Sequence, residues 1–207
     1  MTMKIYVLAN PKGGSGKSTL CRNLAVTAFE EGLSVAIIDT DPQQSTTRWH
    51  TTRTDKLGKE EPALLSLDAS QLKGTIENIR ASKQFDVVFV DTIGKDEEAI
   101  REAIRLADVC IVPCKHTADD LAPVSKLCSQ IGENVAIVES EIIPKSSETQ
   151  IFRSALSALG TIIGETVHRV AYKRTSLSGE GVTEHEPKGK AAEEIKHIWE
   201  KLKSFTL

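Results

Sequence analysis

The sequence predicts an α/β protein: a single domain over residues 1–207, in which a mostly parallel β-sheet lies between two layers of helices. Short apolar runs alternate with helix-like periodicity along the whole chain. These runs are apolar throughout rather than alternating, so their strands must be covered on both faces, as parallel strands are. With 207 residues, 40% of them hydrophobic, the chain is long enough to bury one substantial core.

The first elements follow from these patterns. Ile5–Ala9 is an unbroken apolar run and predicts a buried strand. Ser18–Glu31 has helical periodicity, and Gly32 closes it because glycine commonly follows a helix. Val35–Asp39 predicts a second buried strand, and the polar stretch Ser45–Arg53 is compatible with a helix.

The middle of the chain continues the alternation. Leu64–Leu67 predicts a short strand, and Ser70–Ser82 a helix with Asp68 or Ser70 available as its cap. Phe85–Asp91, with the sequence FDVVFVD, is the clearest strand, and apolar residues from Ile100 to Ala107 recur at helical spacing.

The C-terminal part predicts two more strands before its last helices. Val109–Pro113 and Val135–Val138 are buried strands that flank a helix at Asp119–Ile131. A helix is expected at Ile151–Ile163 and a last strand at Val167–Ala171. Mobile loops are expected at Thr54–Pro62 and Ser176–Gly189, and a final helix presents one apolar face made of Ile195, Ile198, Trp199 and Leu202.

Composition narrows the function classes. The formal net charge of −3 gives no overall attraction to DNA, so DNA binding requires a local basic patch. The four cysteines have neither CxxC nor zinc-site spacing, which indicates reduced, buried thiols in a cytoplasmic protein. No signal peptide is expected at the start, and no segment approaches the ~20 apolar residues of a membrane-spanning helix.

The segment NPKGGSGKST, Asn10 to Thr19, carries the strongest functional signal. It stands directly between a predicted strand and a predicted helix, which is the context of a phosphate-binding loop. The glycines, Gly13, Gly14 and Gly16, let backbone N–H groups approach a phosphate, and the helix N-terminus adds positive potential. The expected nucleotide contacts are Lys12, Gly13, Gly14, Ser15, Gly16, Lys17, Ser18 and Thr19, with Lys17 on the β- and γ-phosphates and Ser18 on Mg²⁺.

The loop departs from the ordinary pattern in one way: it has Pro11 where a glycine is usual, and an additional lysine, Lys12, in the form KGGxGK[ST]. This segment resembles the deviant Walker A motif of the ParA/MinD superfamily of P-loop ATPases. The resemblance implies that Lys12 reaches across a dimer interface to the partner's phosphates. Without it, Lys12 is also compatible with a solvated loop cation.

Two further strand ends fit the resemblance. Val35–Asp39 leads into DTDPQ, which resembles the family's switch I and implies that Asp41 orients the attacking water while Asp39 helps to hold Mg²⁺. Phe85–Val90 leads into DTIG, which resembles Walker B with switch II and implies Asp91 as a Mg²⁺ ligand and Gly94 as a γ-phosphate contact. Ligands of open α/β sheets bind at this edge, so the three segments are expected to meet.

ATP is the expected nucleotide, because no NKxD-like guanine reader follows in the chain. The resemblance places base contacts after a later strand, where relatives often carry Asn or Arg. This chain reads IVESEIIPKSSE there, so the base-contacting residues are left unassigned. The expected cofactors are therefore ATP and Mg²⁺, and the expected activity is weak ATP hydrolysis with Lys12, Lys17, Asp41 and Asp91 as the catalytic residues.

The resemblance extends over nearly the whole chain and is closest to the small plasmid-type ParA proteins, which implies a partition cycle on the nucleoid. ATP would join two chains into a homodimer, the dimer would bind non-specific DNA, and a centromere-binding adaptor of the ParB/ParG kind would stimulate hydrolysis. Such bivalent, electrostatic binding should weaken with salt. Candidate DNA contacts are Lys173, Arg174, Lys188, Lys190, Lys196 and Lys203, with Arg169 as an addition. Each of them, taken alone, is also compatible with an ordinary solvated surface charge.

Other functions remain open at this point. One is an ATPase that positions a membrane system or a protein assembly instead of DNA. Another is a metabolic enzyme of the same fold, such as a dethiobiotin-synthetase-like ligase or an iron–sulfur reductase. The apolar face of the last helix is expected to dock on the core rather than to insert into a membrane, because the closing residues KSFTL offer little to lipid.

Overall fold

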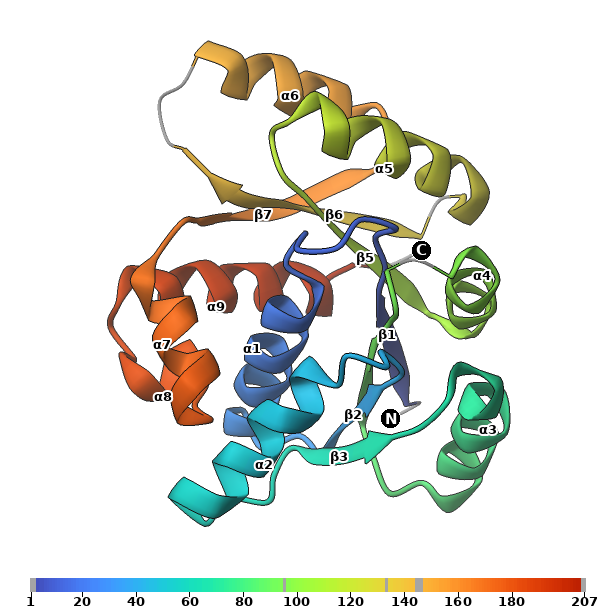
Figure 1. Ribbon diagram of the computed structural model, residues 1–207, viewed down its shortest axis with the longest axis vertical. Helices are drawn as coiled ribbons and strands as arrows, with labels where there is room; N and C mark the ends of the chain where they lie inside the picture. The colour runs from blue at the N-terminus through green and yellow to red at the C-terminus, as the bar shows by residue number, and fades with distance from the viewer. Residues whose placement is uncertain (1–2, 95, 133, 144–146, 206–207) are drawn as a thin grey trace.

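The computed structural model describes residues 3–94, 96–132, 134–143 and 147–205. One seven-stranded sheet runs through the molecule in the order β3-β2-β4-β1-β5-β6-β7 (Figure 1). Every pair of neighbouring strands is parallel, so the predicted sheet is confirmed and is wholly rather than mostly parallel. The strands are β1 (Lys4–Leu8), β2 (Val35–Asp39), β3 (Ala63–Ser66), β4 (Val87–Asp91), β5 (Val109–Cys114), β6 (Val135–Ile142) and β7 (Thr161–Val167).

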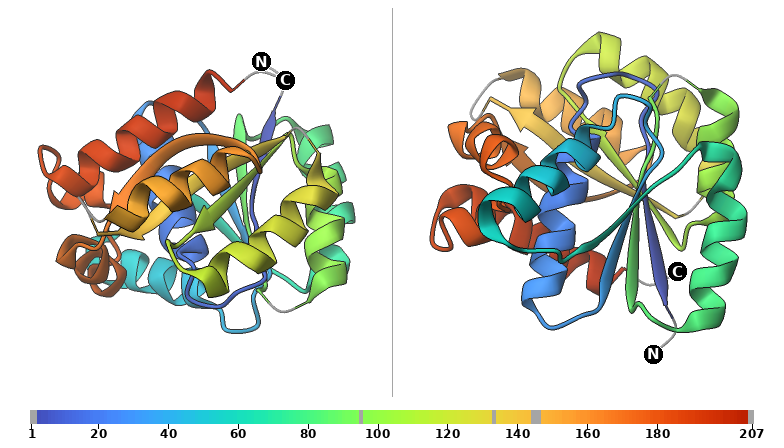
Figure 2. Two further views of the ribbon diagram at one scale, coloured as in Figure 1. Left: turned by 90° about the horizontal axis from the view of Figure 1, so that it is seen from above. Right: turned by 60° about the horizontal axis from the view of Figure 1, so that its bottom comes forward.

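Helices cover both faces of the sheet, as the apolar strands require. One face carries α1 (Lys17–Glu30), α2 (Ser45–Leu57), α7 (Val170–Ser178), α8 (Val182–His185) and α9 (Lys190–Lys203). The other carries the short 3₁₀ helix η1 (Ala69–Gln71), α3 (Leu72–Ser82), α4 (Glu97–Leu106), α5 (Ala118–Ile131) and α6 (Ser147–Ser157). The two layers lie on opposite sides of the strands in both views of Figure 2.

The strand order places three strand ends side by side. In the parallel register, Leu8 of β1 and Asp39 of β2 both lie opposite Asp91 of β4. Two hydrogen bonds just beyond the paired residues hold these strand ends together. The Thr92 hydroxyl donates to the Leu8 carbonyl at 2.7 Å, and the Thr40 N–H donates to the Asp91 carbonyl at 3.0 Å. The loops that follow β1, β2 and β4 therefore start at one edge of the sheet, where ligands of such folds bind.

The region after β6 differs from the sequence prediction. The expected helix Ile151–Ile163 is wrong in its second half: α6 ends at Ser157, and Thr161–Val167 forms β7. The expected strand Val167–Ala171 is also wrong, since α7 begins at Val170. Gly160 marks the change, because a Cβ there would lie 2.8 Å from Val135 Cγ1, so only glycine lets the chain turn into the strand against β6.

Both predicted loops are more regular than expected. Most of Ser176–Gly189 is ordered: α7 extends to Ser178, and α8 follows with Val182 and Thr183 buried. The first residues of Thr54–Pro62 belong to α2. The second segment packs closely on α2 at Gly179, where a Cβ would come within 2.5 Å of the Arg53 backbone.

The last helix docks on the core, as predicted. Ile195, Ile198, Trp199 and Leu202 are all at most 1% exposed and belong to the cluster that includes α1. The Trp199 Nε1–H donates to Glu31 at the end of α1 at 2.9 Å, which anchors the two helices together. Among the described residues, none of the helices is both long and apolar enough to span a membrane. The four cysteines are free and buried, as expected.

Candidate functional site

The loop between β1 and α1 is braced against the neighbouring strand. The Asn10 side chain donates from Nδ2 to the Pro113 carbonyl of β5 at 2.7 Å, and its Oδ1 accepts the Lys12 N–H at 2.7 Å. Gly14 and Gly16 have φ values of 71° and 105°, a region that favours glycine. The sequence therefore builds a rigid loop of glycine amides at the start of α1, the arrangement that binds phosphate.

Lys17 lies at the centre of this loop. Its ammonium group donates to two loop carbonyls, those of Asn10 at 3.1 Å and Lys12 at 3.4 Å. Burial lowers the pKa of Lys17, while the negative charges of Asp91 and Asp41 oppose the shift. Gly94 packs directly against it, since a Cβ at this position would lie 2.9 Å from Lys17 Nζ. The structure thus brings together the predicted residues Lys17, Asp41, Asp91 and Gly94.

Asp91 carries an unused carboxylate oxygen next to this lysine. Asp91 is fully buried; Oδ2 accepts the Thr46 hydroxyl at 2.6 Å, whereas Oδ1 has no hydrogen-bond partner within the described residues. Burial raises the pKa of Asp91 to about 6, and the Thr46 and Ser18 hydroxyls oppose this shift. An orphaned buried oxygen calls for an explanation, and an oxygen ligand beside a serine hydroxyl suits Mg²⁺ and its waters. The residues present therefore fit a magnesium ion held by Ser18 and Asp91.

The Asp39 carboxylate accepts hydrogen bonds from its own subunit in this structure. Its Oδ1 accepts the Asp41 N–H at 3.1 Å, and its Oδ2 accepts both the N–H and the hydroxyl of Thr47 at 2.9 and 2.8 Å. Both oxygens are thus engaged in fixing the turn after β2 and the first turn of α2. The predicted metal role of Asp39 stays a prediction. Asp41 lines the cavity described next, and its Oδ1 accepts the Gln43 N–H at 2.8 Å.

Two adjoining cavities open at this edge. The larger, about 560 Å³, is lined by the whole loop from Gly13 to Thr19 together with Asp41, Ile93 and Gly94. The smaller, about 310 Å³, shares Gly16, Thr19 and Glu141 with it and extends between the ends of β6 and β7 and helix α7. The two cavities therefore meet at Gly16 and Thr19, where α1 begins.

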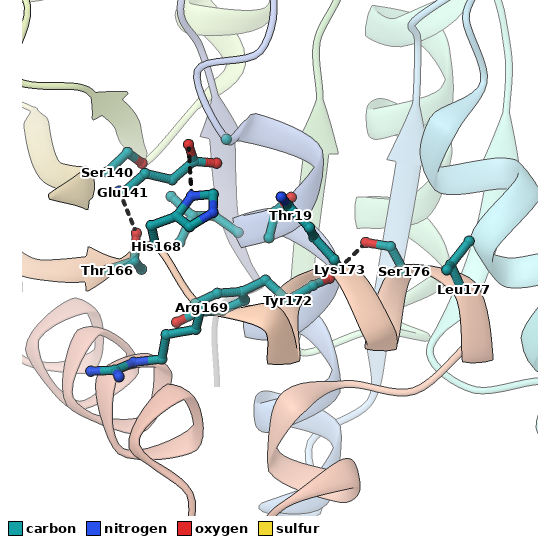
Figure 3. A pocket seen from close by; sticks show the side chains of 12 residues that line it. Thr19, Ser140, Glu141, Thr166, His168, Arg169, Tyr172, Lys173, Ser176 and Leu177 are labelled. Atoms are coloured by element: carbon teal, nitrogen blue, oxygen red, sulfur yellow. Dashed lines mark hydrogen bonds and ion pairs between the residues drawn. The ribbon is translucent and has the colours of Figure 1, made fainter. Parts of the chain in front are cut away.

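The smaller cavity contains residues that the sequence did not identify. Figure 3 shows Glu141 and His168 facing each other at one end and the α7 residues Tyr172, Lys173 and Ser176 along its side. Glu141 Oε2 lies 3.8 Å from His168 Nδ1 and 2.9 Å from Lys115 Nζ. Ser140 and Glu141 belong to the ESE stretch whose base contacts were left unassigned. This cavity could not be predicted from the sequence without β7, because the end of β7 supplies Thr166 and is followed directly by His168.

Comparison with known proteins assigns the family. Residues 6–109, just over half of the chain, match the family model described as "CobQ/CobB/MinD/ParA nucleotide binding domain". The chain belongs to this family. Its predicted relationship to the ParA/MinD superfamily of P-loop ATPases is therefore confirmed, and nucleotide binding is the family's shared property.

Individual relatives of this ParA/MinD-type chain differ in their cargo. It is 29% identical over 144 residues to a protein named ParA from Rhizobium radiobacter, covering 68% of this chain and 61% of that protein. It is 26% identical over 204 residues to a carboxysome distribution protein, "Maintenance of carboxysome distribution protein A", from Halothiobacillus neapolitanus, covering 92% of each. The chain thus spans less than two thirds of the ParA relative but nearly all of the carboxysome one.

A solved structure shares the fold. A putative plasmid partition protein from Borrelia burgdorferi B31, bound to AMPPNP, superposes with a TM-score of 0.74 at 18% identity, covering 98% of this chain and all of that one. Identity at this level shows the common fold alone.

The predicted DNA contacts of this ParA/MinD-type chain do not form one group. Lys173 and Arg174 are exposed on α7, which has no acidic residue, and Lys188 and Lys190 are exposed where α9 begins. Lys203 instead binds Glu31 and Glu200, both at 2.8 Å, at the end of α1 remote from the phosphate loop. Lys196 donates to the Pro187 carbonyl at 3.0 Å, and Arg169 pairs with Glu194 at 2.6 Å. The DNA contacts stay a prediction, and Lys173, Arg174, Lys188 and Lys190 are its exposed members.

Proposed function

We propose that this protein is an ATP-hydrolysing switch that uses its nucleotide state to partition DNA. The observation that carries the proposal is the cavity of about 560 Å³ at one sheet edge, which Lys17, Asp41 and Gly94 line together with the glycine loop. The unpartnered oxygen of Asp91 is buried next to it, at the end of β4. These groups fit a triphosphate with Mg²⁺, and the adjoining cavity fits its base. The name of the ParA relative supports DNA as the cargo.

Each residue has a distinct role in the proposed reaction. Lys17 leaves its two loop carbonyls for phosphate oxygens, because a charged acceptor binds an ammonium group more strongly than a neutral carbonyl. Gly94, which lines the cavity beside Lys17, offers its amide to the terminal phosphate. Asp41 orients water for in-line attack, and Asp91 with Ser18 holds the metal. When bound, Mg²⁺ supplies the positive charge that stabilises the transferring phosphoryl group.

Lys12 links hydrolysis to assembly in this proposal. Its side chain is 39% exposed, so part of it is accessible to a second subunit. Contact with the phosphates of a second subunit makes the homodimer depend on ATP, and two weak basic faces then act as one bivalent DNA site. An adaptor of the centromere-binding kind would stimulate hydrolysis and release the DNA.

DNA binding measured with ATP, with ADP and without nucleotide, across a salt series, tests this function. Binding should be strongest with ATP, should not depend on sequence, and should fall steeply with salt. Equal binding in all three nucleotide states would contradict the proposed switch. The variant Lys17→Ala, which should lose nucleotide binding, is the control for nucleotide dependence.

A second candidate is supported by the carboxysome relative, which aligns with nearly the whole chain. In this alternative the same ATP switch positions a protein assembly instead of DNA. The nucleotide site does not distinguish the two cargoes, because both need only an ATP-gated dimer. Identification of the protein that stimulates hydrolysis, a DNA-binding adaptor or a component of an assembly, would separate them.

A further inference from the structure

Arg22 is a buried arginine on the wall of the larger cavity. It lies on α1 one turn after Ser18, and it is only 8% exposed. Its Nε–H donates to the Ser18 carbonyl at 2.9 Å, and its terminal N–H groups donate to the Ser45 carbonyl of α2 at 3.5 Å and to the Ser176 hydroxyl of α7 at 3.1 Å. All three acceptors are neutral, and no carboxylate accepts a hydrogen bond from Arg22 within the described part of the chain. The guanidinium group is therefore buried without a contacting counter-charge.

A buried positive charge of this kind needs an explanation. Burial lowers the pKa of Arg22, and the negative charge of Asp91 opposes this shift. An arginine side chain nevertheless stays protonated in proteins, so the charge is not lost. Because a buried charge is costly unless an opposite charge contacts it, an arginine in this situation beside a cavity indicates an anionic ligand.

The surrounding fold does not depend on this charge. The Ser176 hydroxyl itself donates to a carbonyl of α7 at 2.9 Å. Ser18 and Ser45 belong to helices, in which a carbonyl group accepts the N–H four residues later. These partners therefore keep a hydrogen bond without the guanidinium group. The Trp49 ring, whose centroid lies 5.9 Å from the Arg22 Cζ, would also pack against an apolar side chain. Binding of a ligand thus explains the buried charge better than the packing of α1 does.

Arg22 lies where the two cavities meet. It lines the larger cavity together with Thr19, which also lines the smaller one, and its partner Ser176 lines the smaller one. Lys17 and Gly94 line the larger cavity and are in contact, since a Cβ on Gly94 would lie 2.9 Å from Lys17 Nζ. With the terminal phosphate at Lys17 and Gly94 and the base in the smaller cavity, the phosphate next to the sugar lies beside Arg22.

We propose that Arg22 is a nucleotide-binding residue whose guanidinium group contacts the α-phosphate, the phosphate next to the sugar. The inference rests on the proposed function, specifically on the binding of ATP across the two cavities. An arginine side chain has more N–H groups than its three hydrogen bonds use here, so others remain for phosphate oxygens. The phosphate supplies the opposite charge that the fold does not.

The position of this contact determines its effect on the reaction. The α-phosphate keeps its charge when the terminal phosphate is cleaved, so the contact stabilises bound ATP and the transition state equally. Arg22 therefore strengthens the binding of ATP and of ADP alike, and it does not change the rate of hydrolysis at saturating ATP.

Three variants separate this role from a structural one. Arg22→Met removes the charge and keeps a long side chain over Trp49, whereas Arg22→Gln removes the charge and keeps a hydrogen-bond donor. Arg48→Met is the matched control, because Arg48 is an exposed arginine of the neighbouring helix α2 whose guanidinium group lies 3.5 Å from the Ser45 hydroxyl. The control removes a positive charge close to the same serine but not from the wall of the cavity.

The first measurement is calorimetric titration of the full chain with Mg-ATP and with Mg-ADP. The loss of a hydrogen bond between charged groups predicts that both Arg22 variants bind both nucleotides about 10- to 100-fold more weakly. Arg48→Met should match wild type. A loss confined to ATP, or wild-type affinity in either Arg22 variant, overturns the inference and leaves the proposed function intact. If wild type binds neither nucleotide, the proposed function fails and the inference fails with it.

The second measurement separates binding from folding and from catalysis. Without nucleotide, Arg22→Met should melt at or above the wild-type temperature, because an uncompensated buried charge has been removed. At saturating ATP it should hydrolyse ATP at the wild-type rate, while its KM is raised. A melting temperature several degrees lower without nucleotide would assign Arg22 to the fold, and a lower rate at saturating ATP would assign it to the metal site beside Asp91. Either result overturns the contact with the α-phosphate.

Discussion

Replacement of Glu184 by glutamine should destabilise the protein in a pH-dependent way. Glu184 lies on α8 and forms a two-pronged contact with fully buried Arg53 of α2, with N–O distances of 2.7 and 2.8 Å. Lys59 and the Gly181 N–H also donate to this carboxylate, at 2.7 and 2.9 Å. Burial opposes ionisation, but these hydrogen bonds outweigh it and lower the pKa of Glu184 to about 2.

The magnitude follows from linkage. A pKa lowered from 4.5 to about 2 corresponds to about 3 kcal/mol of stability at neutral pH. Because the folded pKa is the lower one, this contribution is complete above the unfolded value of 4.5 and is lost as the pH falls toward 2. Removing one partner of a buried ion pair costs a similar amount, about 3–5 kcal/mol.

Urea unfolding of wild type and Glu184→Gln at several pH values measures the effect. The difference in unfolding free energy should be about 3 kcal/mol at pH 7 and about 2 kcal/mol near pH 3.5. Asp55→Asn is the matched control, since Asp55 is exposed on the same helix as Arg53, and should change stability little. A difference below about 1 kcal/mol at pH 7, or one that does not narrow in acid, would refute the reasoning.

Four further predictions concern the nucleotide site and the exposed basic residues of α7. Lys17→Ala should abolish ATP binding, measured by calorimetry. Asp91→Asn should still bind ATP but hydrolyse it about 100-fold more slowly in a phosphate-release assay. Full activity of Asp91→Asn would exclude a role of Asp91 in holding the metal. Gly94→Ala should leave the melting temperature nearly unchanged, because the one atom closer than ordinary contact to the added Cβ is the flexible end of Lys17 at 2.9 Å, while the Asn10 and Lys12 backbone atoms lie at 3.5 and 3.6 Å. It should weaken ATP binding about tenfold by displacing the Lys17 ammonium group, and unchanged affinity would show that Lys17 moves aside without cost. The double variant Lys173→Ala/Arg174→Ala should reduce the salt slope of DNA binding by about two per subunit, or about four for the dimer, and Lys203→Ala should not. A larger effect of Lys203→Ala would place the DNA face on α9.

The sequence predicted the parts of the site that are local in the chain. The loop from Asn10 to Thr19 is contiguous, and its strand–loop–helix context could be inferred from neighbouring residues. Asp39 and Asp91 end clear apolar strands, and parallel strands bring their carboxyl ends to one edge, so their convergence was also predictable. What the pattern could not show is that one of these carboxylates is fully engaged and the other keeps a free oxygen.

The parts that escaped prediction depend on distant packing. Arg53 and Glu184 are 131 positions apart, and both lie in or beside a segment expected to be a mobile loop. The smaller cavity requires β7, which was obscured because Ile162 and Ile163 continue the apolar spacing of the preceding helix. Gly160 and the β-branched run after it were the available signals, and the close approach to Val135 explains why the glycine ends the helix.

The helix α2 provides a physical connection between the nucleotide site and the α7 face. Its first turn is bound by both strand-end carboxylates, through Thr46 to Asp91 and through Thr47 to Asp39. Its last turns are held by Arg53 to α8 and by Lys56, which donates to the Leu177 carbonyl of α7 at 3.1 Å. A change at Asp39 or Asp91 on nucleotide binding therefore acts on a helix that packs against the element carrying Lys173 and Arg174. The proposed nucleotide-dependent DNA binding then needs only a rigid shift of α2 together with α7. Both ends of α2 already carry the necessary hydrogen bonds, one end to the strand-end carboxylates and the other to α7.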